Sequence, residues 1–420
     1  IPFSSALVNF HFDLLQSKGE IVSESVPPHP PQENDPAMIV YTSGTTGAPK
    51  GITHSHYSIC SAVEHSLKVG NISAEDVMLT ILPYTHVFGL INAALVPFYL
   101  GGRNVIGNTL NPMELLTIIS NYNVSYVCLV PRLAEVFAGL LTHMGRKFTG
   151  LKITIGGANC RPDIITRLRA LGIKVGFGFG MTETCGGIFN SFDAPSGSVG
   201  KVAEPVAVKI DNPKDGIGEL LIASPSNTIG VYGRPELNKT LWADQNYLRT
   251  GDIAQIDENG FVYIRGRLKD VIIPAGGMNI YPDELEERLG NLPFIKEYCV
   301  IGVSDHGTEY PALAYRADED FLTKNDVSNV REYIESKIGE ITSSWPEWER
   351  FNSLFKIDEP LPRSYSFKVQ RNSLLEMLKC KSEFDSKTAS SAETESRDAE
   401  VATLFENVKP LIAAHLNIPA

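Results

Sequence analysis

"YTSGTTGAPKG", from Tyr41 to Gly51, gathers hydroxyl side chains, glycines and one lysine into a single short stretch. Glycines let backbone N–H groups approach an anion, hydroxyls donate hydrogen bonds to it, and a lysine supplies a point charge. The Walker loop, G-x-x-x-x-G-K-[ST], fits only in part, because Pro49 replaces its second glycine and Gly51 replaces its magnesium-binding hydroxyl. The stretch therefore predicts either a phosphate-binding loop of another class or a polar surface turn.

The amino-acid composition favours some classes of protein and argues against others. A chain of 420 residues favours two or three domains, and 43% hydrophobic with 20% charged residues is typical of a globular protein. A net charge of −12 argues against nucleic-acid binding. Six scattered cysteines without a C-x-x-C pair indicate reduced thiols and a cytoplasmic location. The longest apolar run, Val87–Leu100, is too short to cross a bilayer and predicts a buried helix.

Short apolar runs alternate with helix-length stretches, which predicts an α/β fold with a doubly wound, mostly parallel sheet. From Ser198 to Ile264, short strands and turns predict a small antiparallel β subdomain, and a compact α+β domain is expected from Asp270 onward. The predicted buried strands are Ala37–Ser43, Asp76–Pro83, Arg103–Gly107, Val124–Pro131 and Lys152–Gly157, and predicted helices include Pro112–Tyr122 and Pro131–Met144.

The sequence changes character near its C-terminus. Residues 381–400 are rich in serine, threonine and acidic side chains and predict a disordered linker. Residues 401–420 repeat apolar side chains at helical spacing and predict an amphipathic helix.

Three further stretches carry side chains suited to nucleotide chemistry. "GFGFGMTETCGG", Gly176–Gly187, places Thr182 and Glu183 after a predicted strand, where open α/β sheets bind ligands and a carboxylate can hold Mg²⁺. "YLRTGD" ends at Asp252, which can accept hydrogen bonds from a ribose, and Arg267 can add a donor. "LPRSYSFKVQR" is cationic. Taken singly, each stretch is also compatible with an ordinary turn or a solvated surface.

In this order and spacing, the four stretches resemble the motifs of the adenylate-forming superfamily, which includes acyl-CoA synthetases, 4-coumarate–CoA ligases and luciferases. Other stretches that resemble its motifs are "PYTHVFG", "IGGANC", "GRLKD" and "GGMNIYPDELE", and the part "PRSYSFK" of the fourth stretch resembles its lysine motif. The resemblance implies a large AMP-binding domain over residues 1–266, incomplete at a truncated N-terminus, a hinge over 267–270 at Lys269, and a mobile α+β C-terminal domain over 271–380.

The resemblance also implies an ATP-dependent acid–thiol ligase that uses ATP, Mg²⁺ and CoA. A fatty or aryl acid would become an acyl-adenylate and then a CoA thioester, with release of pyrophosphate and AMP. Lys368 would bridge the α-phosphate and the carboxylate, His86 would orient the acyl group, and Glu183 would hold the metal. The nucleotide and CoA contacts would come from Thr42, Ser43, Gly44, Thr45, Thr46, Gly47, Lys50, Gly156, Gly157, Ala158, Phe179, Gly180, Thr182, Asp252, Arg267, Gly276 and Gly277.

Two alternatives stay open at this point. The family has glycine where Phe367 precedes the lysine, so the chain is also compatible with a non-catalytic protein that binds ATP or acyl groups. An adenylation domain that loads a carrier protein is the other alternative, because a linker and a helix are predicted after residue 380.

Overall fold

A five-stranded parallel sheet forms the centre of the N-terminal part. The computed structural model describes residues 32–42, 49–145, 147–274, 278–305, 308–363 and 369–388. All neighbouring strands of the sheet run parallel, and their order is β4-β3-β5-β6-β7. The strands are β3 (Val77–Thr80), β4 (Arg103–Ile106), β5 (Tyr126–Leu129), β6 (Lys152–Ile155) and β7 (Lys174–Phe177).

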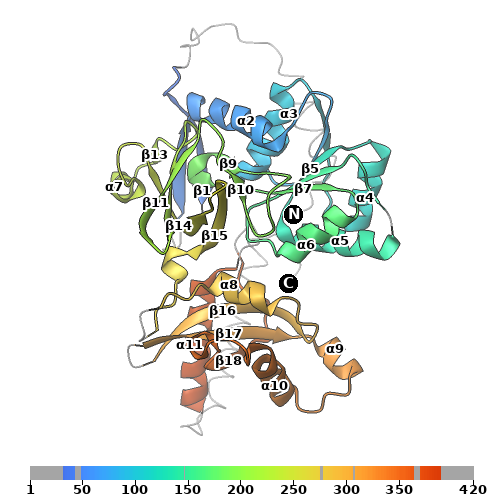
Figure 1. Ribbon diagram of the computed structural model, residues 1–420, viewed down its shortest axis with the longest axis vertical. Helices are drawn as coiled ribbons and strands as arrows, with labels where there is room; N and C mark the ends of the chain where they lie inside the picture. Colours follow the sequence, from blue (N-terminus) through green and yellow to red (C-terminus); the bar gives the residue numbers. More distant parts are fainter. Residues whose placement is uncertain are drawn as a thin grey trace, which may run out of the picture.

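Helices cover both faces of this sheet, as Figure 1 shows. Val77 and Leu79 of β3 pack with α4, α5 and α6, whereas Met78 between them packs with α2 and the π-helical segment η1. Alternate residues of a strand face opposite sides, so the predicted doubly wound α/β fold is confirmed. The helices are α2 (His56–Gly70), η1 (Phe88–Leu95), α3 (Val96–Tyr99), α4 (Pro112–Asn121), α5 (Pro131–Met144) and α6 (Pro162–Ala170).

Two predictions need correction here. Ala37–Ser43 is not a buried strand of the parallel sheet, because β1 (Pro36–Thr42) pairs antiparallel with β2 (Lys50–Ser55) and is mostly exposed. Residues 43–49 are too few for a parallel crossover, which needs about a dozen residues. The run Val87–Leu100 is helical, but it is not buried throughout, since Phe98 is 85% exposed beside the edge strand β4.

The predicted antiparallel β subdomain is confirmed. Its strand order is β10-β15-β14-β12-β11, and every neighbouring pair is antiparallel. These strands are β10 (Gly200–Lys201), β11 (Ala207–Lys214), β12 (Ile217–Ala223), β14 (Leu248–Ile256) and β15 (Phe261–Arg267). Smaller elements beside them are β8 (Phe179–Met181), η2 (Thr182–Thr184), β9 (Gly186–Phe189), β13 (Gly230–Val231) and α7 (Pro235–Leu241).

The C-terminal part is an α+β unit around the sheet β16-β17-β18. Val300 and Leu313 pack on one face of this sheet, and Cys299 and Ala312 pack on the other, in separate hydrophobic clusters. The elements are η3 (Leu268–Asp270), α8 (Pro282–Leu289), β16 (Ile295–Asp305), β17 (Thr308–Ala317), α9 (Glu319–Lys324), α10 (Val330–Thr342), η4 (Glu347–Glu349), β18 (Ser353–Lys356) and α11 (Arg371–Thr388).

The linker predicted from Lys381 is wrong for residues 381–388, which continue helix α11. Leu374 at the start of this helix is fully buried against the sheet, and adding a residue to an existing helix costs little free energy. Residues 389–420, including the predicted amphipathic helix, lie outside the described residues. Within the described part of the chain, no helix is long and apolar enough to cross a membrane.

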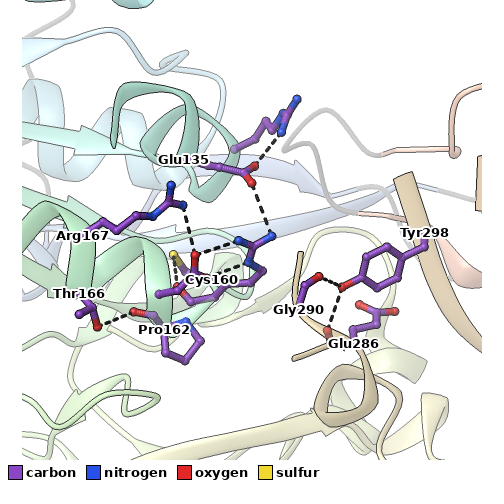
Figure 2. A network of polar contacts seen from close by, with 11 residues as sticks. Glu135, Cys160, Pro162, Thr166, Arg167, Glu286, Gly290 and Tyr298 are labelled. Atoms are coloured by element: carbon purple, nitrogen blue, oxygen red, sulfur yellow. Dashed lines mark hydrogen bonds and ion pairs between the residues drawn. The ribbon is translucent and has the colours of Figure 1, made fainter. Parts of the chain in front are cut away.

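A polar network lies where helices α5 and α6 face α8 and β16 (Figure 2). Arg161 forms ion pairs with Asp163 at 2.9 Å and with Glu135 at 3.6 Å. Across from it, the Tyr298 hydroxyl donates to the Gly290 carbonyl oxygen at 2.6 Å. Burial raises the pKa of Tyr298, and Arg161 acts on it in the opposite direction. The N-terminal and C-terminal parts are therefore within electrostatic reach of each other here.

Arg371 ties the start of α11 to two other elements. Its guanidinium contacts Asp270 of η3 at 3.4 Å and Asp283 and Glu286 of α8 at 2.5 and 2.7 Å. Burial disfavours the charge, but these carboxylates outweigh it and hold the pKa of Arg371 well above its usual value. The residue therefore has a structural role, not the solvated one that its cationic stretch also allowed.

We expect Arg371→Leu to lower the free energy of unfolding by about 3–5 kcal/mol, because it leaves buried carboxylates without a counter-charge. Urea denaturation followed by circular dichroism measures the effect. The matched control is Arg363→Leu, which removes a more exposed arginine paired with Glu297 at 3.5 Å and should cost at most about 1 kcal/mol. Equal losses in the two variants would contradict the structural role.

Candidate active site

The candidate site lies at the carboxyl ends of the parallel strands, where open α/β sheets bind ligands. Gly156 and Gly157 follow β6, Gly178 follows β7, and all three line one cavity together with His86. Gly157 has a φ of +87°, which favours glycine, and a Cβ on Gly156 would come within 3.3 Å of the Phe88 ring. Phe179 and Gly180 also line the cavity, whereas Ala158 is not among its lining residues.

The short turn Thr182–Thr184 is held from two sides. His54 Nε2 donates to the Thr182 carbonyl oxygen at 2.8 Å, and the Thr228 N–H donates to the Glu183 carbonyl oxygen at 2.7 Å. Burial lowers the pKa of His54 to about 4, so its ring is neutral and carries its hydrogen on Nε2. A Cβ on Gly180 would lie 2.0 Å from the Gly186 carbonyl oxygen, so only glycine fits beside the turn.

Glu183 lies within electrostatic reach of two cations. Burial raises the pKa of its carboxyl, and Arg267 and Lys50 lower it. Both cations are therefore close enough to act on the Glu183 charge, although Lys50 begins β2 and Arg267 ends β15. The fold thus brings together three residues that are far apart in the sequence.

Asp252 and Arg267 lie opposite each other on the paired strands β14 and β15. Arg267 Nε is 2.8 Å from Asp252 Oδ1, and Arg267 Nη1 donates to the Thr250 carbonyl oxygen at 3.1 Å. Asp252 is only 4% exposed, and its backbone N–H donates to Thr250 Oγ1 at 3.0 Å. This buried carboxylate, fixed beside a guanidinium, offers acceptors and donors to neighbouring hydroxyl groups of a ligand.

Lys269 adds a third cation that the sequence analysis treated only as a hinge. Burial lowers its pKa, and the charges of Arg267, Arg371 and Lys50 lower it further, against the effect of Asp270. The sequence held one indication that Lys269 lies near the other cations, because it stands two residues after Arg267 in "GRLKD". Because like charges repel, this cluster is completed best by an anion.

Of the remaining predicted residues, Thr42 and His86 lie within the described part of the chain and the others do not. Thr42 ends β1 and is half-buried, and His86 Nδ1 accepts from the Phe88 N–H at 3.2 Å. Burial lowers the pKa of His86, so it is a neutral ring with its hydrogen on Nε2. Ser43, Gly44, Thr45, Thr46, Gly47, Gly276, Gly277, Phe367 and Lys368 lie outside the described residues.

The sequence analysis did not find the inner end of the cavity. Tyr126 of β5, Thr154 of β6 and Asn190 after β9 meet there, with the Tyr126 hydroxyl 2.6 Å from Thr154 Oγ1. Polar side chains inside apolar strands were the available signal, but the sequence alone does not show which strand faces the cavity. The hydrogen bond from His54 to the Thr182 turn was not foreseen either.

Glu183→Gln should raise the melting temperature at pH 8 and leave it unchanged at pH 4. The folded-state pKa of Glu183 is raised, so its ionisation destabilises the fold as pH rises above the unfolded-state value of 4.5. Below that pH both states are protonated, and glutamine resembles the neutral acid. Thermal denaturation at the two pH values measures this. A lower melting temperature at pH 8 would mean that the cations favour the charged form more than burial opposes it.

Comparison with known proteins shows to which family the chain belongs. The family model described as AMP-binding enzyme matches residues 6–232. Over 307 residues the chain is 33% identical to a 2-succinylbenzoate–CoA ligase of Staphylococcus epidermidis, covering 69% of this chain and 61% of that protein. Over 375 residues it is 29% identical to a malonate–CoA ligase of Arabidopsis thaliana, covering 82% and 61%. The chain thus spans about three fifths of the length of these curated relatives.

A solved structure shares the fold. The O-succinylbenzoate coenzyme A synthetase from Bacillus subtilis, in complex with ATP and magnesium ion, superposes with a TM-score of 0.72 at 28% identity. The match covers 82% of this chain and 70% of that one. Since the family model also covers more than half of the sequence, the chain belongs to the AMP-binding enzyme family.

Proposed function

We propose that the chain is an acid–thiol ligase, which activates a carboxylic acid with ATP and transfers the acyl group to the thiol of CoA. The observation that carries this proposal is that Arg267 and Lys50 both act on the charge of Glu183, with Lys269 within reach of the same two cations. Such a cluster suits a polyphosphate with a divalent cation. The relative solved with ATP and magnesium ion and the relatives named as CoA ligases support the same reaction class.

The described residues fit a nucleotide in parts. Gly156, Gly157 and Phe179 line the cavity and would contact an adenine. Ala158, which does not line the cavity, would complete this contact from the next position in the chain. Asp252 and Arg267 would hold the ribose hydroxyls through the carboxylate and the guanidinium. Thr182 would contact a phosphate group, and Lys50 would supply the positive charge that balances it. The loop of residues 43–47 would complete the phosphate site.

Glu183 fits a magnesium ion bound mainly by phosphates. Mg²⁺ usually takes one or two protein carboxylates and completes its shell with phosphate oxygens and water. Within the described ranges, no group of three or more histidine, cysteine or acidic side chains could hold a metal alone. The ion would supply charge neutralisation at the phosphates. Burial raises the pKa of Glu183 and so favours its neutral form. A bound cation would act in the opposite direction and favour the ionised form.

The chemistry needs a better leaving group on the acid. A carboxylate oxygen attacks the α-phosphorus, the bond to pyrophosphate breaks, and an acyl-adenylate forms. The CoA sulfur then attacks the acyl carbon, and AMP leaves with the bonding electrons. Lys368 would stabilise the first step, since a unit charge about 4 Å away contributes about 4 kcal/mol at an effective dielectric of 20. The neutral His86 would orient the acyl group at the cavity mouth.

We further propose that the chain divides as the family resemblance implies. Residues 1–266 and 271–380 would form the two domains, and the hinge would lie at 267–270. Rotation of the C-terminal domain about Lys269 would move Lys368 out of the site. The same rotation would bring in Gly276 and Gly277, which would border the arm of CoA. The separate hydrophobic clusters of the two parts support this division, because each part has its own core.

Incubation with ATP, Mg²⁺, CoA and a panel of carboxylic acids tests the proposed function. Mass spectrometry should detect AMP and one acyl-CoA in equal amounts, both dependent on the acid. ATP binding without AMP formation from any acid would favour the non-catalytic binding protein. An acyl-adenylate that accumulates with CoA present would favour transfer to a carrier protein.

Lys50→Ala should raise the KM for ATP about tenfold to a hundredfold, because one charge-assisted contact to phosphate contributes roughly 1.5–3 kcal/mol. Steady-state kinetics measure this, and an unchanged melting temperature shows that the fold is intact. Lys209→Ala is the matched control, since Lys209 pairs with Asp244 in the β subdomain. An ATP KM equal to that of the control would exclude Lys50 from the phosphate site.

A further inference from the structure

We propose that Arg265 is a positioning residue, which docks helix α8 of the C-terminal part on strand β15 and so holds the two parts in the arrangement of this structure. This inference rests on the proposed function, because it names a contact that the proposed rotation about Lys269 would have to break. An ion pair across the junction, the packing beside it and the charge pattern of α8 carry the inference.

The guanidinium of Arg265 reaches both sides of the junction. Its Nη2 donates to Gln255 Oε1 of β14 at 2.6 Å, within the N-terminal part. Its Nη1 donates to Glu284 Oε1 of α8 at 3.1 Å, within the C-terminal part. A planar guanidinium offers its donors in fixed directions, so the bond to Gln255 orients the group that meets Glu284. The contact is therefore preorganised from the N-terminal side.

The first turn of α8 packs on the end of β15. A Cβ on Gly266 would lie 3.8 Å from Tyr281 Cβ and 3.9 Å from Asp283 Oδ2. On its other face, α8 buries Leu285 and Leu289 in the hydrophobic core of the C-terminal part. Because α8 is firmly packed into that core, a contact that fixes α8 also fixes the C-terminal part.

The acidic residues of α8 are divided between two arginines. Arg371 of α11, within the C-terminal part, pairs with two of them. Arg265 pairs with Glu284 from the other side of the junction. Burial raises the pKa values of Glu284 and Glu287, and the charge of Arg265 acts on both in the opposite direction. Two carboxylates of α8 thus interact with a cation from the other part of the molecule.

The far end of α8 also lies within reach of an arginine from the N-terminal part. The Tyr298 hydroxyl lies 2.9 Å and 2.6 Å from the backbone carbonyl oxygens of Glu286 and Gly290, where α8 ends (Figure 2). Arg161, just before α6, acts on the charge of Tyr298. The docking of α8 therefore relies on charge at both ends, and added salt should weaken it.

The ion pair can favour one arrangement and still allow rotation. Arg265 and Glu284 are 35% and 37% exposed, so solvent screens their attraction. A contact that exists in only one arrangement shifts the population by no more than its own contribution. We therefore expect loss of this pair to lower the ratio of docked to undocked molecules by about threefold, as is typical of an exposed ion pair.

The test measures the distance between the two parts by electron paramagnetic resonance. One spin label is attached to Cys60 on α2, which is exposed, and the other to Lys324→Cys on α9, also an exposed position. Cys380→Ser prevents labelling at that site, and the other cysteines are buried. Rotation of the C-terminal part would change this distance, so its distribution gives the ratio of docked to undocked molecules.

Arg265→Ala should lower that ratio by about threefold, and Arg265→Glu should lower it further, because like charges would then face each other. Arg265→Glu combined with Glu284→Arg should restore the ratio toward the wild-type value, since the charges are exchanged but the pair is kept. A role of Arg265 confined to its own sheet would not be rescued by a change on α8. Arg234→Ala is the matched control, because Arg234 pairs with Glu236 at 2.6 Å inside the N-terminal part.

The charge exchange decides the inference. A lower ratio in Arg265→Glu that the exchange restores supports it, provided that the control keeps the wild-type ratio. Equal ratios in wild type and Arg265→Glu, or no recovery in the exchanged pair, overturn it. The measurement needs no acid, CoA or turnover, so such a result leaves the ligase function standing. A chain that docks as described but forms no AMP from any acid would support the docking and refute the ligase function.

Discussion

The fixed position of the Thr182–Glu183 turn is the constraint on which the candidate site depends. The turn follows the parallel sheet, yet it is held by His54 from the hairpin β1–β2 and by Thr228 from the segment before β13. Glu183 then faces Arg267 from the β subdomain and Lys50 from the hairpin. Three separate sheets therefore meet at one carboxylate, and a shift of any of them would change its environment.

The proposed function would oppose stability at the candidate site. Lys50, Arg267 and Lys269 repel one another, and burial disfavours the charges of both Glu183 and Lys269. An acidic chain with a net charge of −12 has to gather its cations locally to attract a polyphosphate. The Arg267–Asp252 ion pair balances part of this charge. The remaining imbalance is what a polyphosphate with its metal would relieve.

Much of the fold could be predicted from the sequence, because the buried parallel strands are short, mostly apolar runs, such as Tyr126–Leu129 of β5, that are soon followed by glycine or proline. β1 has a similar composition, and only the short connection to β2 decides that it pairs in a hairpin. The end of α11 was missed because residues 381–388 are polar, whereas the helix is anchored by Leu374 near its start.

The candidate site was predictable in its motifs but not in its contacts. Glu183, Asp252 and Arg267 stand in recognisable stretches, so their chemistry could be inferred from residue type and spacing. The role of Lys269 in the cation cluster and that of His54 behind Thr182 depend on distances between separate elements. The same holds for Asn190 and Thr154, whose hydrogen bond joins a residue that follows β9 to a residue within β6. Local sequence patterns contain no information on such long-range contacts.

Calorimetric titration with ATP, in the presence and absence of Mg²⁺, tests the central claim most directly, because it asks whether the cluster around Glu183 is a nucleotide site. The account predicts that wild type binds Mg·ATP, that Asp252→Asn weakens binding with or without the metal, and that Glu183→Gln weakens it only when Mg²⁺ is present. Binding of Mg·ATP with equal affinity to wild type and both variants would contradict the account.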